Sequence, residues 1–177
     1  MKTLKNLILI ALLFSAVQVN AQTDKATTAR ILEAKNYVFA ANTAYPLNSS
    51  DMNRILNSMP GSTGGNINLT GSSYDLTVTP DSLVAYLPYF GRSYTPKLGT
   101  ADDSGIKFKS KKFTYKSVQR KKGSTLVTIR TQDLQNNYDL TLNITETGYA
   151  SLSVNNNNQQ PINFGGYLAE PKVKKEK

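Results

Sequence analysis

The densest apolar stretch of the chain, apart from its first residues, runs from Leu83 to Tyr94. Its first five residues, 83–87, are all apolar or aromatic, so both sides of the segment carry apolar side chains. This pattern predicts a central strand with protein against both of its faces. Pro88 has no amide hydrogen for a ladder, so the strand should stop there or lie at the edge of a sheet.

Alternation of apolar and polar residues predicts further strands along most of the chain. It is clearest at 138–145, where Leu140 faces one side and Thr141 the other. The same period of two recurs, with turn-forming residues between the segments, at 37–42, 74–79, 106–109, 113–116, 127–130, 150–155 and 162–167. We therefore expect about eight or nine strands. The first of them should end before Pro46, because proline disfavours a continuing ladder.

Two segments show helical spacing instead. Asp24 is placed to cap a short helix that extends to about Ala34 and carries a broken apolar stripe. A second short helix is expected within residues 48–65, because four apolar residues between positions 52 and 59 recur at helical spacing. This insertion either covers one end of the core or forms a lid over a pocket, and its pattern favours the cover.

The order of these elements indicates a mainly β protein. An antiparallel meander with one apolar and one polar face must curl around its own core or pack against a second sheet. Curling also removes exposed strand edges. We therefore predict an up-and-down, lipocalin-like barrel or half-barrel with the short N-terminal helix over one end. A two-sheet β-sandwich is the alternative.

Residues 1–21 are expected to be a signal peptide. Two lysines precede an apolar run from Leu7 to Val17, and small residues lead to Ala21. A run of about eleven residues is too short to span a bilayer. Cleavage after Ala21 would leave a single β-rich domain over residues 22–169 and a basic, disordered tail over 170–177. We expect the mature protein in the periplasm or outside the cell, without a transmembrane segment.

The chain contains no cysteine and no histidine. The missing cysteine excludes disulfides, thiolate metal ligands and a cysteine-linked lipid anchor. The missing histidine removes the commonest general base and the Ser-His-Asp arrangement. The remaining carboxylates, lysines and tyrosines form no recognisable catalytic constellation. We therefore expect a protein that is not an enzyme and carries no cofactor.

The formal net charge of +9 comes from 21 basic and 12 acidic residues. Much of the excess lies in residues 107–122, which contain eight basic residues and no acidic one. Such a patch attracts anionic partners, although export makes nucleic acid the least suitable of them. The patch is either the solvated face of a hairpin that protects a strand edge or a docking surface for another envelope protein. The candidate docking residues are Lys107, Lys109, Lys111, Lys112 and Lys116.

Aromatic residues beside an arginine follow the central strand. Tyr89, Phe90, Arg92 and Tyr94 are candidates to stack on a sugar ring or to hold an anionic group. The alternative, which the pattern favours, is that Tyr89 and Phe90 plug one end of the core. In that case Gly91 would supply a backbone angle that other residues resist.

Asp102 and Asp103 are the only adjacent carboxylates in the chain. With the following serine they are weak candidates for a calcium site built from oxygen ligands. They lack the spaced Asp-x-Asp-x-Asp-Gly pattern, and adjacent aspartates are common in solvated loops. We therefore expect no metal here.

Four separated blocks carry a resemblance to a known family. In order, they are residues 86–92 (Tyr-Leu-Pro-Tyr-Phe-Gly-Arg), 105–108 (Gly-Ile-Lys-Phe), 148–154 (Gly-Tyr-Ala-Ser-Leu-Ser-Val) and 160–167 (Gln-Pro-Ile-Asn-Phe-Gly-Gly-Tyr). With them, nearly the whole mature chain resembles the exported proteins of Bacteroidota-type bacteria grouped as domain-of-unknown-function family 4251. The resemblance implies a cell-envelope location and a β-rich, lipocalin-like fold, but no activity. Some relatives resemble lipoproteins, whereas this chain lacks the cysteine for such an anchor.

Two functions follow from these observations. The first is a non-catalytic cell-envelope protein that binds a lipid, glycan or peptide at its curved sheet. The second is a protein-interaction module that docks through the basic hairpin face.

Overall fold

The structure is a computed structural model that describes residues 23–47, 58, 62–63, 65–94 and 105–171. Four features of the sequence lie outside the described residues: the expected signal peptide, most of the insertion, the Asp102-Asp103 pair and the end of the basic tail.

The first element is the short helix α2, Lys25–Glu33. Asp24 caps it as predicted, because its carboxylate accepts the backbone N–H of Thr27 at 2.7 Å. This bond satisfies one of the donors that a helix leaves free in its first turn. Thr28 and Ile31 are the buried residues of α2. Across the described ranges, no helix has the length and apolar character needed to cross a membrane.

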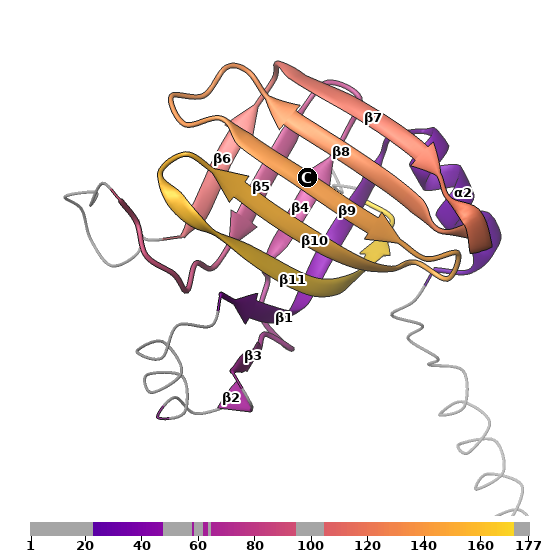
Figure 1. Cartoon of the computed structure of the whole chain (residues 1–177). Helices are drawn as coiled ribbons and strands as arrows, with labels where there is room; N and C mark the ends of the chain where they lie inside the picture. Colours follow the sequence, from indigo (N-terminus) through magenta and orange to yellow (C-terminus); the bar gives the residue numbers. More distant parts are fainter. Residues whose placement is uncertain (1–22, 48–57, 59–61, 64, 95–104, 172–177) are drawn as a thin grey trace, which may run out of the picture.

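Strands make up most of the remaining described chain. Nine of them form one antiparallel path in the order β6-β5-β4-β1-β11-β10-β9-β8-β7 (Figure 1). Two short strands lie off this path: β2 pairs with β3, which also pairs with β1. The bounds are β1 Tyr37–Pro46, β2 Ser62–Thr63, β3 Asn66–Asn68, β4 Asp75–Val78, β5 Leu83–Leu87, β6 Ile106–Ser110, β7 Phe113–Gln119, β8 Thr125–Thr131, β9 Tyr138–Ile144, β10 Tyr149–Asn156 and β11 Gln159–Ala169, with a 3-10 turn η2 at Lys121–Gly123.

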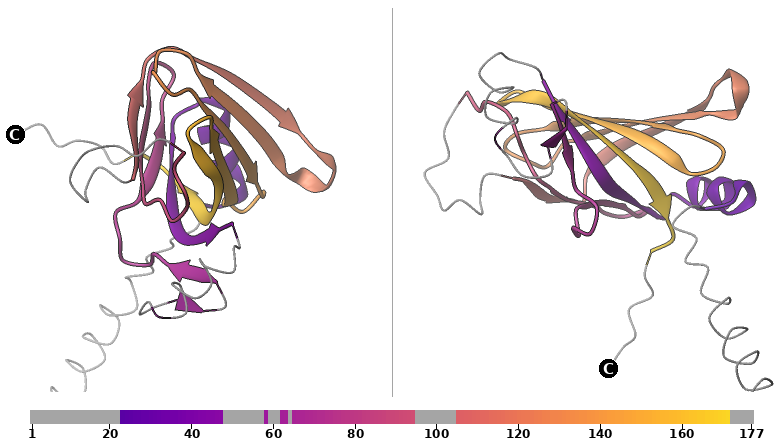
Figure 2. Two further views of the ribbon diagram at one scale, coloured as in Figure 1. Left: turned by 60° about the vertical axis from the view of Figure 1, so that its left-hand side comes forward. Right: turned by 90° about the horizontal axis from the view of Figure 1, so that it is seen from below.

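The path is that of an up-and-down barrel. Apart from the β2–β3 excursion and the β6–β7 step, strands that follow one another in the chain pair along this path, and β1 pairs with β11 from Val38–Ala169 to Pro46–Ile162. Figure 2 shows the strands wrapped around a common axis, with α2 beside one end. The predicted mainly-β barrel with a short N-terminal helix is confirmed, and the sandwich alternative is wrong. The first strand is longer than predicted, because it includes Pro46 as its last residue.

The barrel is open between β6 and β7, which are the two ends of the path. Only Lys111 and Lys112 separate these strands, yet the strands do not pair with each other. The carboxylate of Asp133 accepts the N–H groups of Lys111 and Lys112 at 2.7 and 3.1 Å, and the Ser110 hydroxyl also donates to it. These bonds hold a corner in the chain. Residues 107–122 therefore do not form one hairpin face. Instead β7 forms a hairpin with β8, and its turn includes Lys122 and Gly123.

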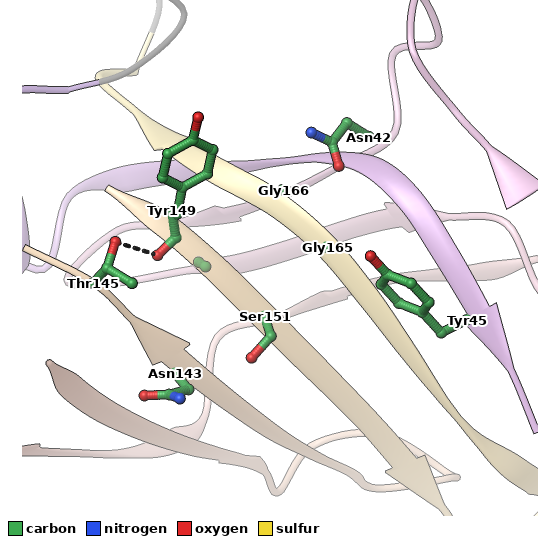
Figure 3. Close-up of a pocket in the computed structure, with 9 residues that line it drawn as sticks. Asn42, Tyr45, Asn143, Thr145, Tyr149, Ser151, Gly165 and Gly166 are labelled. Atoms are coloured by element: carbon green, nitrogen blue, oxygen red, sulfur yellow. Dashed lines mark hydrogen bonds between the residues drawn. The ribbon is translucent and has the colours of Figure 1, made fainter. Parts of the chain in front are cut away.

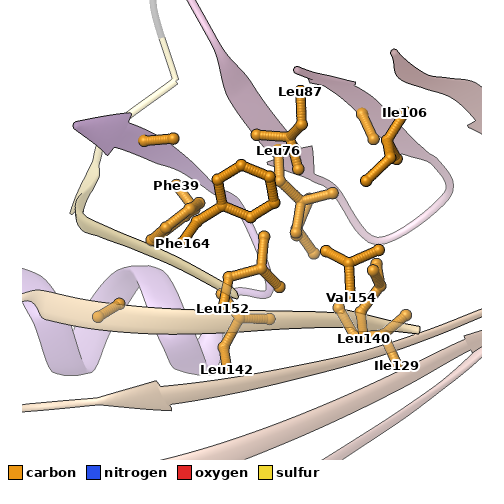
Figure 4. Packing of buried hydrophobic residues seen from close by; sticks show 14 of the residues in the cluster. Phe39, Leu76, Leu87, Ile106, Ile129, Leu140, Leu142, Leu152, Val154 and Phe164 are labelled. Carbon is orange, nitrogen blue, oxygen red and sulfur yellow. The ribbon is translucent and has the colours of Figure 1, made fainter. Parts of the chain in front are cut away.

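Side chains fill the interior of the barrel. Residues of β1, β4, β5 and β6 meet residues of β8 to β11 in one buried cluster (Figure 4). Its largest fully buried members include Tyr37, Phe39 and Phe164. Each such side chain contributes about 1.5–3 kcal/mol through removal of apolar surface from water. Since the described interior is a packed core, binding surfaces are to be sought on the outside and at the ends of the barrel.

The central strand β5 is covered on one face only. Its three odd-numbered residues are buried, but Tyr86 is 44% exposed and Val84 is half-buried. The Tyr86 ring stacks on Tyr74 at a centroid distance of 5.6 Å. The prediction of protein on both faces is therefore wrong: among the described residues, neighbours in the same sheet partly shelter the outward side chains, and no second layer covers them. The strand ends before Pro88, as predicted.

Candidate functional site

The outer face of the barrel is hollowed where β1, β11, β10 and β9 run side by side (Figure 3). The depression has a volume of about 370 Å³ and is open to solvent. We call it the tyrosine groove, after Tyr45 and Tyr149. Its lining consists of Asn42, Tyr45, Asn143, Thr145, Tyr149, Ala150, Ser151, Gly165 and Gly166.

A β-bulge in β1 places Tyr45 in this groove. Ala41 pairs with Gly166 and Thr43 with Gly165, so Asn42 is an extra residue without an opposite number on β11. Before the bulge the odd-numbered residues of β1 face the core, and after it the even-numbered ones do. An uninterrupted strand would point Tyr45 into the core, but here its side chain is 40% exposed. Bulges redirect side chains in this way, often beside functional sites.

Two glycines of β11 form the floor of the tyrosine groove. A Cβ atom on Gly165 would stand 3.1 Å from the Tyr45 hydroxyl, so the phenol lies directly over this residue. A Cβ atom on Gly166 would stand 2.1 Å from the carbonyl oxygen of Ala40 and 2.9 Å from Cζ of Phe39. Gly166 therefore permits the close approach of β1 and β11, while Gly165 leaves room on the outer face.

The opposite side of the groove comes from β10 and β9. Tyr149 is 48% exposed and begins β10, whose even-numbered residues face the core. Thr145 is held by two bonds to the Tyr149 carbonyl oxygen, one from its backbone N–H at 2.8 Å and one from its hydroxyl at 3.2 Å. Ser151 adds a hydroxyl group on β10, and Asn143 adds an amide group beside it on β9 (Figure 3).

The tyrosine groove is electrically neutral although the whole chain carries a formal charge of +9. All of its lining residues are aromatic, amide, hydroxyl, alanine or glycine residues. Such a surface can stack a ring against tyrosine and exchange hydrogen bonds with hydroxyl groups. Among the described residues there is also no cluster of three or more acidic, histidine or cysteine residues that could hold a metal ion. The predicted weak metal candidates, Asp102 and Asp103, lie outside those residues.

The predicted aromatic site, residues 89–94, lies elsewhere. The Tyr89 hydroxyl lies 2.8 Å from the Arg92 carbonyl oxygen and 3.1 Å from that of Gln160, and burial raises the pKa of Tyr89 to about 12. Tyr89 and Phe90 pack against the core cluster. These contacts agree with the plug interpretation, while a binding role for Arg92 and the 69% exposed Tyr94 stays a prediction.

The reason for a glycine at position 91 differs from the predicted one. The φ angle of Gly91 is not positive, so no unusual backbone angle requires glycine at this position. A Cβ atom there would stand 2.5 Å from the Tyr89 hydroxyl. Glycine is therefore needed for the close approach of the Tyr89 ring.

The five candidate docking lysines are divided between the two ends of the sheet. Lys107 and Lys109 lie on β6, Lys111 and Lys112 form the corner, and Lys116 lies on β7. All five side chains are exposed, and Lys107 Nζ lies 5.0 Å from the centroid of the Tyr86 ring. They therefore flank the opening of the barrel instead of forming one hairpin face.

Sequence reasoning missed the tyrosine groove. Two signals were available in the sequence. The Gly165-Gly166 pair lies inside a strand pattern, where glycine marks close backbone approach, and Tyr149 falls on the outward side of the 150–155 alternation. Neither signal shows that these residues meet Tyr45, because that contact depends on the β1 bulge and on the β1–β11 pairing.

Comparison with known proteins agrees with this architecture. The sequence matches the family described as Domain of unknown function (DUF4251) over residues 20–168. The crystal structure of a DUF4251 family protein from Bacteroides eggerthii DSM 20697 is similar, with a TM-score of 0.54 and 13% sequence identity, covering 82% of this chain and 87% of that chain. At this identity the similarity concerns the fold. No curated protein matches the chain. Since the family match extends over most of the sequence, the protein belongs to the DUF4251 family.

Proposed function

We propose that this protein is an exported, non-catalytic binding protein that holds a neutral glycan chain in the tyrosine groove. The observation that carries the proposal is the pair of exposed tyrosines on either side of a glycine floor, in a lining without any charged residue. Each tyrosine offers an apolar ring face to a sugar ring, and the neighbouring amides and hydroxyls match sugar hydroxyl groups. Export is supported by the signal-peptide pattern of residues 1–21.

The spacing of the two tyrosines favours a chain of sugars over a single sugar. Tyr45 pairs with Asn163 and Tyr149 with Tyr167, on opposite sides of β11. Four residues along the strand and two strand spacings place the two Cα atoms roughly 16 Å apart. A ligand that lies along the groove from one of these residues to the other is therefore extended.

Two other ligand classes fit the groove less well. A lipid tail needs an enclosed apolar cavity, whereas this groove is open and the barrel interior is filled by the core cluster. An extended peptide commonly binds by adding a strand to a sheet edge. The groove lies on the face of β1, β11 and β10, whose backbone groups already pair within the sheet. Ring stacking and side-chain hydrogen bonds remain, and these suit a glycan.

The test is isothermal titration of the purified protein with a panel of neutral oligosaccharides built from glucose, xylose, mannose or N-acetylglucosamine. We expect binding of at least one member, and we expect Tyr45→Ala and Tyr149→Ala each to weaken it at least about tenfold, since a lost stacking contact of about 1.4 kcal/mol corresponds to that factor. Tyr86→Ala is the matched control, because Tyr86 is 44% exposed but lies on β5, away from the groove.

Three results would count against the proposal. Absence of binding across the panel would rule out a neutral glycan as the ligand. An equal loss in the Tyr86 variant would show that the effect is not local to the groove. Loss of binding in Tyr94→Ala, with the groove variants unaffected, would move the site to the Arg92–Tyr94 segment.

A further inference from the structure

Strand β7 leaves one of its two edges without a strand partner among the described residues. All seven of its residues pair with β8 on one side. On the other side the Asp133 corner directs β6 away, so that β7 ends the sheet path. Figure 2 shows the β7–β8 hairpin extending beyond the neighbouring strands. An edge without a strand partner is a template for pairing with another chain. At the end of β7, Gln119 lies beside α2, with which it lines a small cavity.

The register identifies the backbone groups that point away from β8. The Arg120 N–H donates to the Ser124 carbonyl oxygen at 2.7 Å, and the Gln132 N–H donates to that of Lys112 at 2.8 Å. In an antiparallel ladder, directly opposed residues alternate between bonded and non-bonded pairs. Both ends of the ladder therefore assign the β8-facing bonds to the even-numbered residues of β7. The N–H and C=O groups of the odd-numbered residues, Ser117 and Gln119 among them, face the open edge.

The side chains around this edge are cationic. Lys116, Arg120 and Lys121 are exposed, as are the corner residues Lys111 and Lys112, and residues 107–122 contain no acidic side chain. Lysines are also a common means of protecting an edge. Within β7, however, Lys116 is the only charged residue, and the second half of the strand exposes Ser117, Gln119 and the 59% exposed Val118. The positive charges around β7 therefore attract an acidic segment, while the uncharged second half of the strand leaves the edge accessible to it.

We infer that β7 accepts an extended acidic segment of a partner protein as an additional strand. Main-chain hydrogen bonds to the odd-numbered residues hold the segment, and the surrounding cations select its charge. A second copy of this chain is the wrong occupant, because two β7 edges would bring their lysines and Arg120 side chains together. This inference is independent of the tyrosine groove, which lies on β1, β9, β10 and β11.

The test measures fluorescence anisotropy of a labelled eight-residue peptide of alternating glutamate, valine and threonine, titrated with the purified protein. We expect saturable binding that weakens with added salt. Ser117→Pro removes one N–H from the open edge and leaves the hydrogen bonds to β8 in place. It should weaken peptide binding about tenfold or more, because the peptide loses one main-chain hydrogen bond and meets the proline ring at the same position. Ser117→Ala, which keeps the N–H, should bind like the original protein.

Four results would overturn the inference: no binding of the acidic peptide, equal binding of a peptide with lysine in place of glutamate, equal affinity of Ser117→Pro and Ser117→Ala, or dimerisation of the protein that excludes the peptide. Gln119→Pro is the second variant if Ser117→Pro does not fold by circular dichroism. Hydrogen exchange of the original protein also tests whether the peptide pairs with the edge: the peptide should slow exchange of the Ser117 and Gln119 amides. Unchanged exchange at both amides would contradict strand addition.

Discussion

The hydroxyl of Tyr45 lies 3.1 Å from the position that a Cβ atom on Gly165 would occupy. The tyrosine ring therefore rests on the one place in this part of β11 where the outer face carries no side chain. The contact joins β1 to β11, the first and last strands of the chain, which pair in the middle of the sheet path. The pairing of these two strands therefore also determines the shape of the tyrosine groove.

Gly165→Ala should weaken glycan binding several-fold while leaving the fold intact. The added methyl group meets the end of a side chain that can move, so the cost is a displaced Tyr45 ring, not a clash with backbone. The double variant Gly165→Ala, Tyr45→Phe removes the hydroxyl from this contact and should recover part of the affinity. Titration calorimetry of both variants measures the effect, and unchanged binding in the single variant would show that the ring position does not matter.

Gly166→Ala should destabilise the protein by about 1–3 kcal/mol, the usual cost of overpacking a tight interior. Its Cβ atom would stand 2.1 Å from the carbonyl oxygen of Ala40, so the paired backbones of β1 and β11 must shift. Urea unfolding followed by circular dichroism gives the free energy of unfolding. An unfolding free energy for Gly166→Ala equal to that for Gly165→Ala would show that the close approach of β1 and β11 does not require glycine at position 166.

Asp133→Asn should destabilise the protein at neutral pH, and the difference from the original protein should shrink in acid. The Ser110 hydroxyl and the N–H groups of Lys111 and Lys112 stabilise the carboxylate and lower the pKa of Asp133 below its ordinary value of 3.8. This contribution is present above pH 3.8 and is lost as the pH falls through the lowered pKa. Urea unfolding as a function of pH measures both proteins. A constant difference across the acid range would show that the corner does not depend on this charge.

Tyr37→Phe should reduce the loss of stability in alkali. Burial, then the neighbouring Tyr115, raises the pKa of Tyr37 well above its ordinary value of 10.0. The neutral phenol therefore contributes stability that is present below pH 10.0 and disappears as the pH rises toward the raised pKa. Thermal unfolding on both sides of pH 10.0 compares the variant with the original protein. Equal alkaline sensitivity would place the responsible group elsewhere, with Tyr115 as the next candidate, since burial raises its pKa as well.

The period-two pattern was sufficient for the barrel but not for its opening. Segments such as 138–145 and 150–155 alternate because one side of each strand faces the core, and the order of turns then leads to a meander. The opening between β6 and β7 depends on Asp133, which reaches back 21 and 22 residues to the Lys112 and Lys111 amides. No local sequence pattern around Lys111 and Lys112 predicts that contact.

The candidate site was harder to predict for a related reason. The aromatic residues of the 89–94 segment are adjacent in sequence and so suggest a binding site, yet the Tyr89 hydroxyl bonds to the Gln160 carbonyl oxygen. The groove residues are scattered over four strands, and Tyr45 reaches the outer face only through the extra residue at Asn42. A bulge leaves no clear period in a ten-residue strand, so neither its position nor its consequence was predictable.

The most direct test of the glycan-binding account is a two-dimensional amide NMR titration of the protein with the same panel of neutral oligosaccharides. The account predicts that a bound member shifts the backbone signals of Ser151, Gly165 and Gly166 and the side-chain amide signals of Asn42 and Asn143. Shifts confined to Arg92–Tyr94 or to β7, or no shift with any member of the panel, would contradict it.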